Sequence, residues 1–166
     1  MRRALVVGLV VVAGSALAGC GSGEKVISTN SALAVFRKAG FPNLIVLSNK
    51  KAAEQLGLAD AAKAADMDTI VASVNGRPAL YGPLLAVRLQ SVGVATDDYA
   101  KFWAPKAIRA ALKVARAQHV VPPGFDLRRF RSLRVCNLLL QSYNAHGDPG
   151  LSARFSRAVR LLQARC

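Results

Sequence analysis

The Asn75-Gly76 pair constrains the fold of this 166-residue chain more than any other local pattern. Asn-Gly is typical of the tight two-residue turn that joins antiparallel strands, because that turn needs positive φ angles. Residues 69–74, rich in β-branched side chains, form the strand that we expect before it. Pro78 and Pro83 delay the regular return strand to residues 84–90, since proline is confined to strand starts and edges. The chain is therefore expected to contain an antiparallel sheet.

Further strands and helices follow from hydrophobic periodicity and from capping residues. We expect strands at residues 43–47 and 133–143, and helices at residues 32–39, 49–55 and 58–67. Thr96, followed by two aspartates, is a favourable helix start, and Pro105 is expected to end or kink that helix and to begin another that runs to about residue 117. Asp148-Pro149 opens the last helix, which places apolar side chains on one face. This order predicts an α+β fold: a small, mostly antiparallel sheet with helices on one face.

The N-terminus carries the layout of a secretory signal: Arg2-Arg3, an uncharged apolar run over residues 4–17, and small residues that end at a cysteine. The run is shorter than the roughly 20 residues that span a bilayer. Leu17-Ala18-Gly19-Cys20 resembles the lipobox of bacterial lipoproteins. An ordinary signal peptide cut elsewhere is the alternative.

The lipobox resemblance implies that the Cys20 sulfur carries diacylglycerol and that the chain is cut just before it. It divides the chain into a signal peptide (1–19), a lipidated cysteine with a flexible tether (20–30) and one α+β domain (31–166). The implied location is the extracytoplasmic face of a cell membrane, where two or more acyl chains anchor a protein stably.

Two cysteines remain once Cys20 is assigned to lipid. Outside the cytoplasm an even number of remaining cysteines favours a disulfide, so we expect Cys136 and Cys166 to be paired. Both fall on apolar faces, of the strand at 133–143 and of the last helix. Closing a loop of about 30 residues stabilises a fold by about 3–4 kcal/mol in the chain-entropy model. We expect no metal and no cofactor, because two sulfurs without neighbouring Cys or His make no zinc site.

Positive charge is concentrated in the C-terminal part of the chain. Residues 20–100 hold eight Lys or Arg against seven Asp or Glu, and residues 101–166 hold thirteen against two. At a membrane such a balance points to anionic lipid, an anionic wall polymer or an acidic envelope protein rather than to nucleic acid. The alternative explanation for this excess of positive charge is simply the base composition of the genome.

Two groups of cations are the candidate contacts. Spacings of 3, 4 and 3 put the first group on one helical face, beside apolar residues that line another. An ordinary solvated helix face is the alternative for this group. The first group comprises Lys106, Arg109, Lys113 and Arg116, and the second comprises Arg128, Arg129, Arg131 and Arg134.

Catalytic patterns are missing from the sequence. His119 and His146 have no base or ligand partner at a useful spacing, and Asp97-Asp98 is explained by helix-start chemistry. We therefore expect a non-enzymatic lipoprotein that binds an anionic envelope component or a partner protein. The alternative is an accessory module that binds a small ligand, with Tyr81, Trp103 and Tyr143 lining its pocket. Trp103 and Phe102 are otherwise expected in the core.

Overall fold

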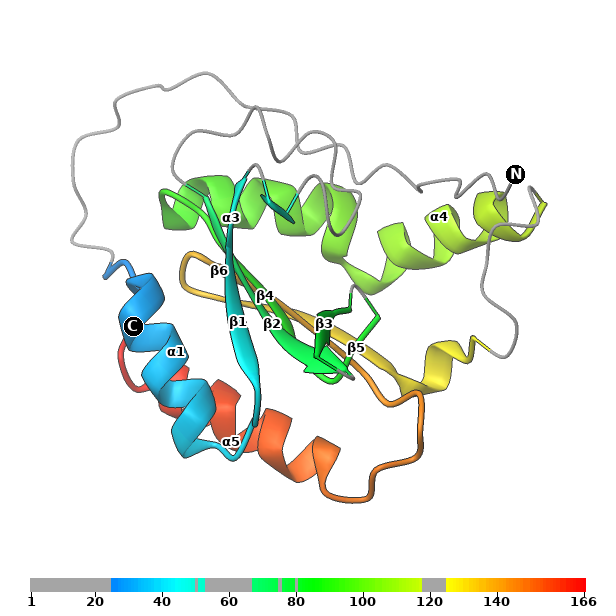
Figure 1. The fold of residues 1–166 in the computed structure, drawn as a ribbon. Helices are drawn as coiled ribbons and strands as arrows, with labels where there is room; N and C mark the ends of the chain where they lie inside the picture. The colour runs from blue at the N-terminus through cyan, green and yellow to red at the C-terminus, as the bar shows by residue number, and fades with distance from the viewer. Residues whose placement is uncertain (1–24, 50, 53–66, 75, 80, 118–124) are drawn as a thin grey trace.

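The computed structural model describes residues 25–49, 51–52, 67–74, 76–79, 81–117 and 125–166. Helices lie on both sides of one sheet (Figure 1). The α-helices are α1 (Thr29–Lys38), α3 (Val92–Asp98), α4 (Pro105–Ala117) and α5 (Leu151–Gln163). A π-helix, η2 (Tyr99–Trp103), and a 3-10 turn, η3 (Leu127–Arg129), connect other elements. The strands are β1 (Leu44–Ser48), β2 (Asp68–Val74), β3 (Arg77–Pro78), β4 (Leu85–Arg88), β5 (Phe130–Val135) and β6 (Leu138–Tyr143).

The sheet is antiparallel throughout the described residues, in the order β1-β2-β4-β6-β5, and the short β3 also pairs with β2. Val74 lies opposite Arg77, which leaves the two-residue turn that the Asn75-Gly76 pair predicts. Gly76 has a φ of 76°, a conformation that glycine adopts without a steric penalty. The return strand is confirmed as β4, which pairs with β2.

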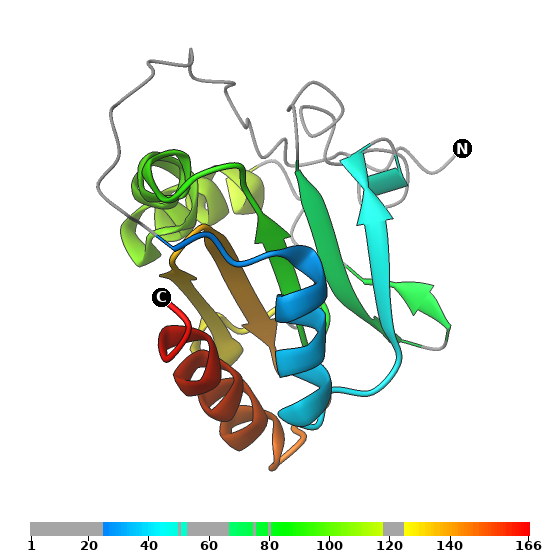
Figure 2. The ribbon, with the colours of Figure 1, turned by 90° about the vertical axis from the view of Figure 1, so that its left-hand side faces the viewer.

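The two faces of the sheet are covered by different helices (Figure 2). Successive side chains of a strand point to opposite faces. Accordingly Leu138 and Leu140 pack in one core with α1 and α5, whereas Leu139 packs in a second core with α3 and η2. The α+β class and the antiparallel sheet are confirmed. The expectation of helices on one face only is corrected, because the central strands are apolar on both faces.

The predicted single strand at residues 133–143 is a hairpin of β5 and β6 instead. Val135 lies opposite Leu138, so Cys136 and Asn137 form a two-residue turn in which Cys136 has a φ of 50°. The turn is hard to recognise in the sequence, because no glycine or Asn-Gly pair marks it and Leu138 to Leu140 suggest one long buried strand.

The predicted disulfide between Cys136 and Cys166 is confirmed, with 5.9 Å between the two Cα atoms. It ties the β5–β6 turn to the end of the chain just after α5. The bridge borders the core that α1 and α5 share with the sheet, and Cys136 itself belongs to that core.

Helix boundaries differ from the sequence prediction where tertiary contacts decide them. Ser91, not Thr96, caps α3: its Oγ accepts from the Val94 amide at 3.2 Å. Pro105 separates η2 from α4, and the predicted helix from 105 to 117 is confirmed. The predicted helices at 49–55 and 58–67 fall largely outside the described residues, which include only 49, 51, 52 and 67 of these two ranges.

The last helix begins later than Asp148-Pro149 predicts. The Asp148 carboxylate accepts from the Gly150 amide at 2.8 Å, and α5 starts at Leu151. The predicted buried face of this helix is confirmed, with Leu151, Phe155, Ala158 and Leu162 in the core.

Candidate functional site

Helix α4 carries the first predicted group of cations. Lys106, Arg109 and Lys113 are exposed along it, and the Arg109 Nε donates to the Pro105 carbonyl oxygen at 3.2 Å. Spacings of three and four residues place these side chains on neighbouring turns of one face. The side chain of Arg116, the fourth member, lies outside the described part of the chain.

Among the described residues, no acidic side chain forms an ion pair with a cation of α4. Across the described ranges, the ion pairs join Asp68 to Arg88, Asp126 to two arginines and Asp148 to Arg154, and none involves α4. The helix itself contains no aspartate or glutamate. Its charge is therefore directed into the solvent and is available to an anion.

An adjoining face of α4 is apolar and only partly buried. Ile108 and Leu112 are half-buried, yet they belong to neither of the two cores formed by the described residues. The helix packs against η2 at its N-terminal end and extends beyond the sheet (Figure 1). It is an amphipathic helix whose main contacts in the described part of the chain are with η2.

The π-helix η2 fixes the position of α4. The Ala104 amide donates to the Tyr99 carbonyl at 2.7 Å, which is the i→i+5 bond of a π-turn. Ser132 of β5 donates its hydroxyl to the Trp103 carbonyl at 2.7 Å, and the Tyr99 hydroxyl donates to the Ser132 carbonyl at 3.4 Å. Sequence analysis missed these anchors, since no periodic pattern links residues about 30 positions apart.

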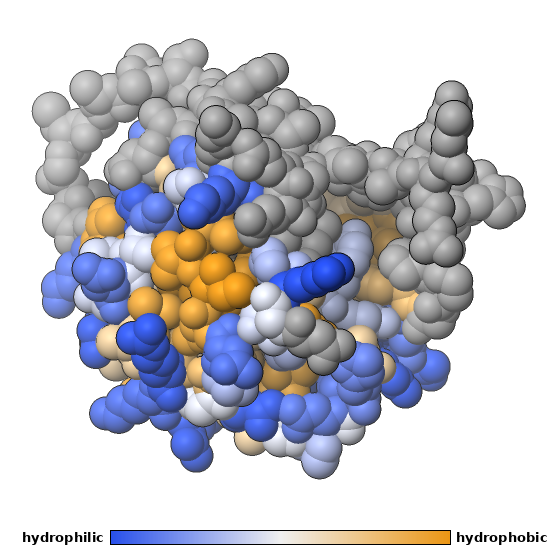
Figure 3. Space-filling view, viewed as in Figure 1, coloured by the Kyte–Doolittle hydropathy of each residue, from blue (hydrophilic) through white to orange (hydrophobic). Residues whose placement is uncertain are grey.

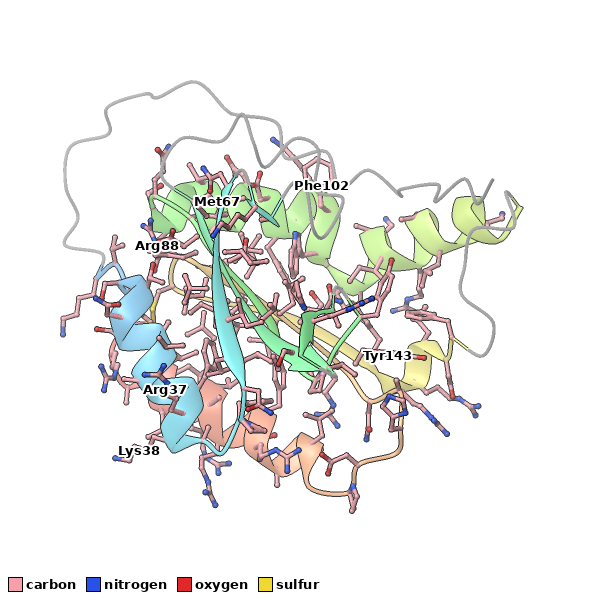
Figure 4. All side chains as sticks on the ribbon, in the orientation of Figure 1. Arg37, Lys38, Met67, Arg88, Phe102 and Tyr143 are labelled. Carbon is pink, nitrogen blue, oxygen red and sulfur yellow. A yellow bond between two sulfur atoms is a disulfide. The ribbon has the colours of Figure 1, made fainter. Side chains whose placement is uncertain are left out.

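Trp103 and Phe102 belong to the interior, which confirms that they are part of the core. Trp103 is buried in the core beneath α3 and η2, and Phe102 packs against it (Figure 4). Asp98, the last residue of α3, is also buried, and burial raises the pKa of its carboxyl group. The sequence predicts that Asp98 stabilises the first turn of a helix. That role does not apply, because Asp98 is the last residue of α3.

The second predicted group of arginines does not form one surface. Arg128 and Arg129 both face Asp126, and the hydrogen bonds from Arg128 lower the pKa of that carboxylate. On β5, Arg131 and Arg134 are three positions apart, so they point to opposite faces of the sheet. Arg134 donates to the Cys136 carbonyl at 3.0 Å. The structure therefore separates these four side chains.

The alternative function, binding of a small ligand, predicts that Tyr81, Trp103 and Tyr143 line one pocket. The structure brings only two of these three aromatic residues together. Tyr81 and Tyr143 are in edge-to-face contact with ring centroids 6.5 Å apart, and Phe125 stacks on Tyr143 at 4.7 Å. Trp103 belongs to the other cluster, under η2.

The two histidines are the remaining candidates for metal or catalytic chemistry. His146 is exposed in the loop before α5, and His119 lies outside the described residues. Within the described ranges, no group of three or more His, Cys, Asp or Glu side chains is placed to hold a metal ion.

None of the helices in the described ranges has the length and apolar character needed to cross a membrane. Comparisons of the chain with protein-family models, with curated proteins and with solved structures found no match.

Proposed function

We propose that this protein is a lipid-anchored domain on the extracytoplasmic face of a membrane, and that α4 binds the anionic headgroups of that membrane. The observation that carries the proposal is the set of three exposed cations, Lys106, Arg109 and Lys113, with no carboxylate partner among the described residues. The anchor is the diacylglycerol that the lipobox resemblance implies at Cys20.

The expected energy of this contact is modest and needs the anchor. A Lys or Arg near an anionic membrane contributes about 1 kcal/mol, so three contribute about 3 kcal/mol. Such an affinity is weak for a free domain. A short tether raises the effective concentration of α4 at the surface, and the second contact then forms without a large loss of translational freedom.

The arrangement of the fold supports a joint role for tether and helix. The segment that leads into α1, which joins the domain to residues 20–24, lies in the upper half of Figure 1, as does α4. The half-buried Ile108 and Leu112 supply apolar surface to the same contact.

A fluorescent label on α4 tests the proposal in the acylated full-length protein. Ala110 is exposed between Lys106 and Lys113, so an Ala110→Cys variant carries the label on the cationic face. The protein is inserted into vesicles of phosphatidylcholine, with or without phosphatidylglycerol. We expect a headgroup-attached quencher to reduce the fluorescence only when phosphatidylglycerol is present, and added salt to reverse the effect.

The matched control removes three charges elsewhere. Arg157, Arg160 and Arg165 are exposed on or just after α5, and their replacement by glutamine is expected to leave the quenching unchanged. Replacement of Lys106, Arg109 and Lys113 by glutamine is expected to abolish it. Equal quenching in neutral vesicles, or equal loss in both triple variants, would overturn the proposal. Quenching that is lost on addition of a soluble anionic wall polymer would identify that polymer as the preferred ligand instead.

A further inference from the structure

The two edges of the sheet differ in how their backbone groups are satisfied. At the β5 edge, Ser132 directs its carbonyl away from β6, and this oxygen accepts from the Tyr99 hydroxyl of η2 at 3.4 Å. The Ser132 hydroxyl is also engaged, by the Trp103 carbonyl. The β5 edge is therefore covered by the π-helix.

The β1 edge has no comparable cover among the described residues. The Ser73 amide donates to the Asn43 carbonyl at 2.9 Å, which makes Asn43 and Ser73 a hydrogen-bonded pair. Because bonded and non-bonded pairs alternate along antiparallel strands, the peptide groups of Leu44, Val46 and Ser48 point away from β2. In the described part of the chain no backbone bond beyond the β1–β2 ladder reaches these three residues.

This open edge coincides with an apolar surface. Val46 is 42% exposed, and its neighbours Leu44 and Ile45 are half-buried. Figure 3 shows apolar side chains gathered where β1 runs along the front of the molecule, with hydrophilic residues around them. The strand Leu44–Ser48 contains no lysine, proline or glycine, which are the residues that usually protect an edge from pairing.

The rim of the β1 edge is basic. Arg37 and Lys38 are exposed in the last turn of α1, seven and six positions before β1 begins (both are labelled in Figure 4), and Lys51 is exposed just after the strand. The carboxylate of Asp68, opposite Ser48 on β2, is already occupied by Arg88 and by the Thr29 hydroxyl. Exposed cations thus precede and follow an apolar strand whose outward peptide groups have no partner in the described part of the chain.

We propose that the β1 edge binds an extended, acidic segment of a partner protein, which adds a strand to the sheet beside β1. The main-chain groups of Leu44, Val46 and Ser48 supply the pairing, and the basic rim selects the charge of the partner. A second copy of this chain is a poorer occupant. Two-fold pairing of β1 with itself would place the same basic rim on both sides, and like charges disfavour that contact.

A labelled peptide of alternating glutamate and valine is the probe, added to the acylated full-length protein in neutral detergent micelles. Fluorescence anisotropy measures binding, and hydrogen exchange reports the amides of Leu44, Val46 and Ser48. We expect binding with slowed exchange at these three amides. The same peptide with lysine in place of glutamate is expected to bind at least about tenfold more weakly, which is about 1.4 kcal/mol.

Two variants of one exposed position separate backbone pairing from side-chain contact. Val46→Pro removes the outward amide, whereas Val46→Thr keeps it, and proline is tolerated on an edge strand. We expect about tenfold weaker binding for the proline variant and near-native binding for the threonine variant. Val46→Glu, at an exposed position that should not disturb folding, tests the charge: it is expected to repel the acidic peptide.

Three results would overturn this proposal. One is equal binding of the glutamate and lysine peptides, and another is native affinity in both Val46→Pro and Val46→Glu. The third is a dimer in sedimentation experiments that Val46→Glu dissociates while no peptide binds, which would make a second copy the occupant. None of these results depends on α4 or on the lipid contact.

Discussion

The side-chain amide of Asn137 bonds both the N–H and the C=O of Ile27, although 110 positions separate the two residues. Its Oδ1 accepts from the Ile27 amide at 2.8 Å, and its Nδ2 donates to the carbonyls of Ile27 and Leu89 at 3.2 and 2.8 Å. The Asn137 carbonyl also accepts from the Leu89 amide. One fully buried side chain therefore joins the segment before α1, the end of β4 and the β5–β6 turn.

Asn137→Ala should destabilise the domain by about 2–4 kcal/mol, because it leaves buried peptide groups of Ile27 and Leu89 without partners. Urea denaturation measures the change. Gln163→Ala, at an exposed position near the end of α5, is the control and should alter the free energy of unfolding by less than about 0.5 kcal/mol. Equal stability of the two variants would show that the Asn137 bonds contribute little.

Replacement of both Cys136 and Cys166 by serine should cost about 3–4 kcal/mol, since the bridge closes a loop with a sequence separation of 30. The same loss should follow reduction of the native protein. Mass spectrometry after alkylation without a reductant checks the pairing. Alkylation of both thiols in protein isolated from the envelope would refute the disulfide.

Asp98→Asn should stabilise the domain near neutral pH. Burial raises the pKa of Asp98 in the folded protein above its ordinary value of about 3.9. The folded state therefore binds a proton that the unfolded state releases, and stability falls as the pH rises from below the ordinary pKa through the folded pKa. The gain in melting temperature from the substitution should be present at neutral pH and absent near pH ~3. A gain of the same size at both pH values would rule out ionisation as its cause.

Arg154→Gln should reduce the sensitivity of the fold to acid. The bond from Arg154, helped by the Gly150 amide, lowers the pKa of Asp148. This contribution to stability is present above the ordinary carboxyl pKa and is lost as the pH falls through the lowered value. Thermal melts between neutral and acid pH should show a shallower acid decline in the variant. If stability declines with acid in the same way in the variant and in the native protein, other carboxylates must dominate that decline.

Where a single residue determines the local backbone conformation, the sequence predicted the structure correctly. Gly76 marks the turn after β2, and Pro105 separates η2 from α4. The helical period of the α4 cations also predicted their exposure correctly for the three described side chains. These features depend on neighbours within a few positions, which is why the sequence alone is sufficient to predict them.

Features set by distant contacts were not predictable in this way. The turn at Cys136 and Asn137 is stabilised by Ile27 and Leu89, which no local pattern connects to it. The strand that became β1 was predicted, but its place at the edge depends on the order of all strands. Likewise the separation of Arg131 from Arg134 depends on β5 beginning at Phe130, and the pairing of β5 with β6 decides that start rather than a local pattern.

The central claim is that α4 contacts anionic lipid, and hydrogen exchange of residues 105–117 tests it most directly. The acylated full-length protein is compared in phosphatidylcholine vesicles with and without phosphatidylglycerol. We predict slower amide exchange along α4 when the anionic lipid is present, and no slowing when Lys106, Arg109 and Lys113 are replaced by glutamine. Identical exchange of α4 in the two kinds of vesicle would contradict the account.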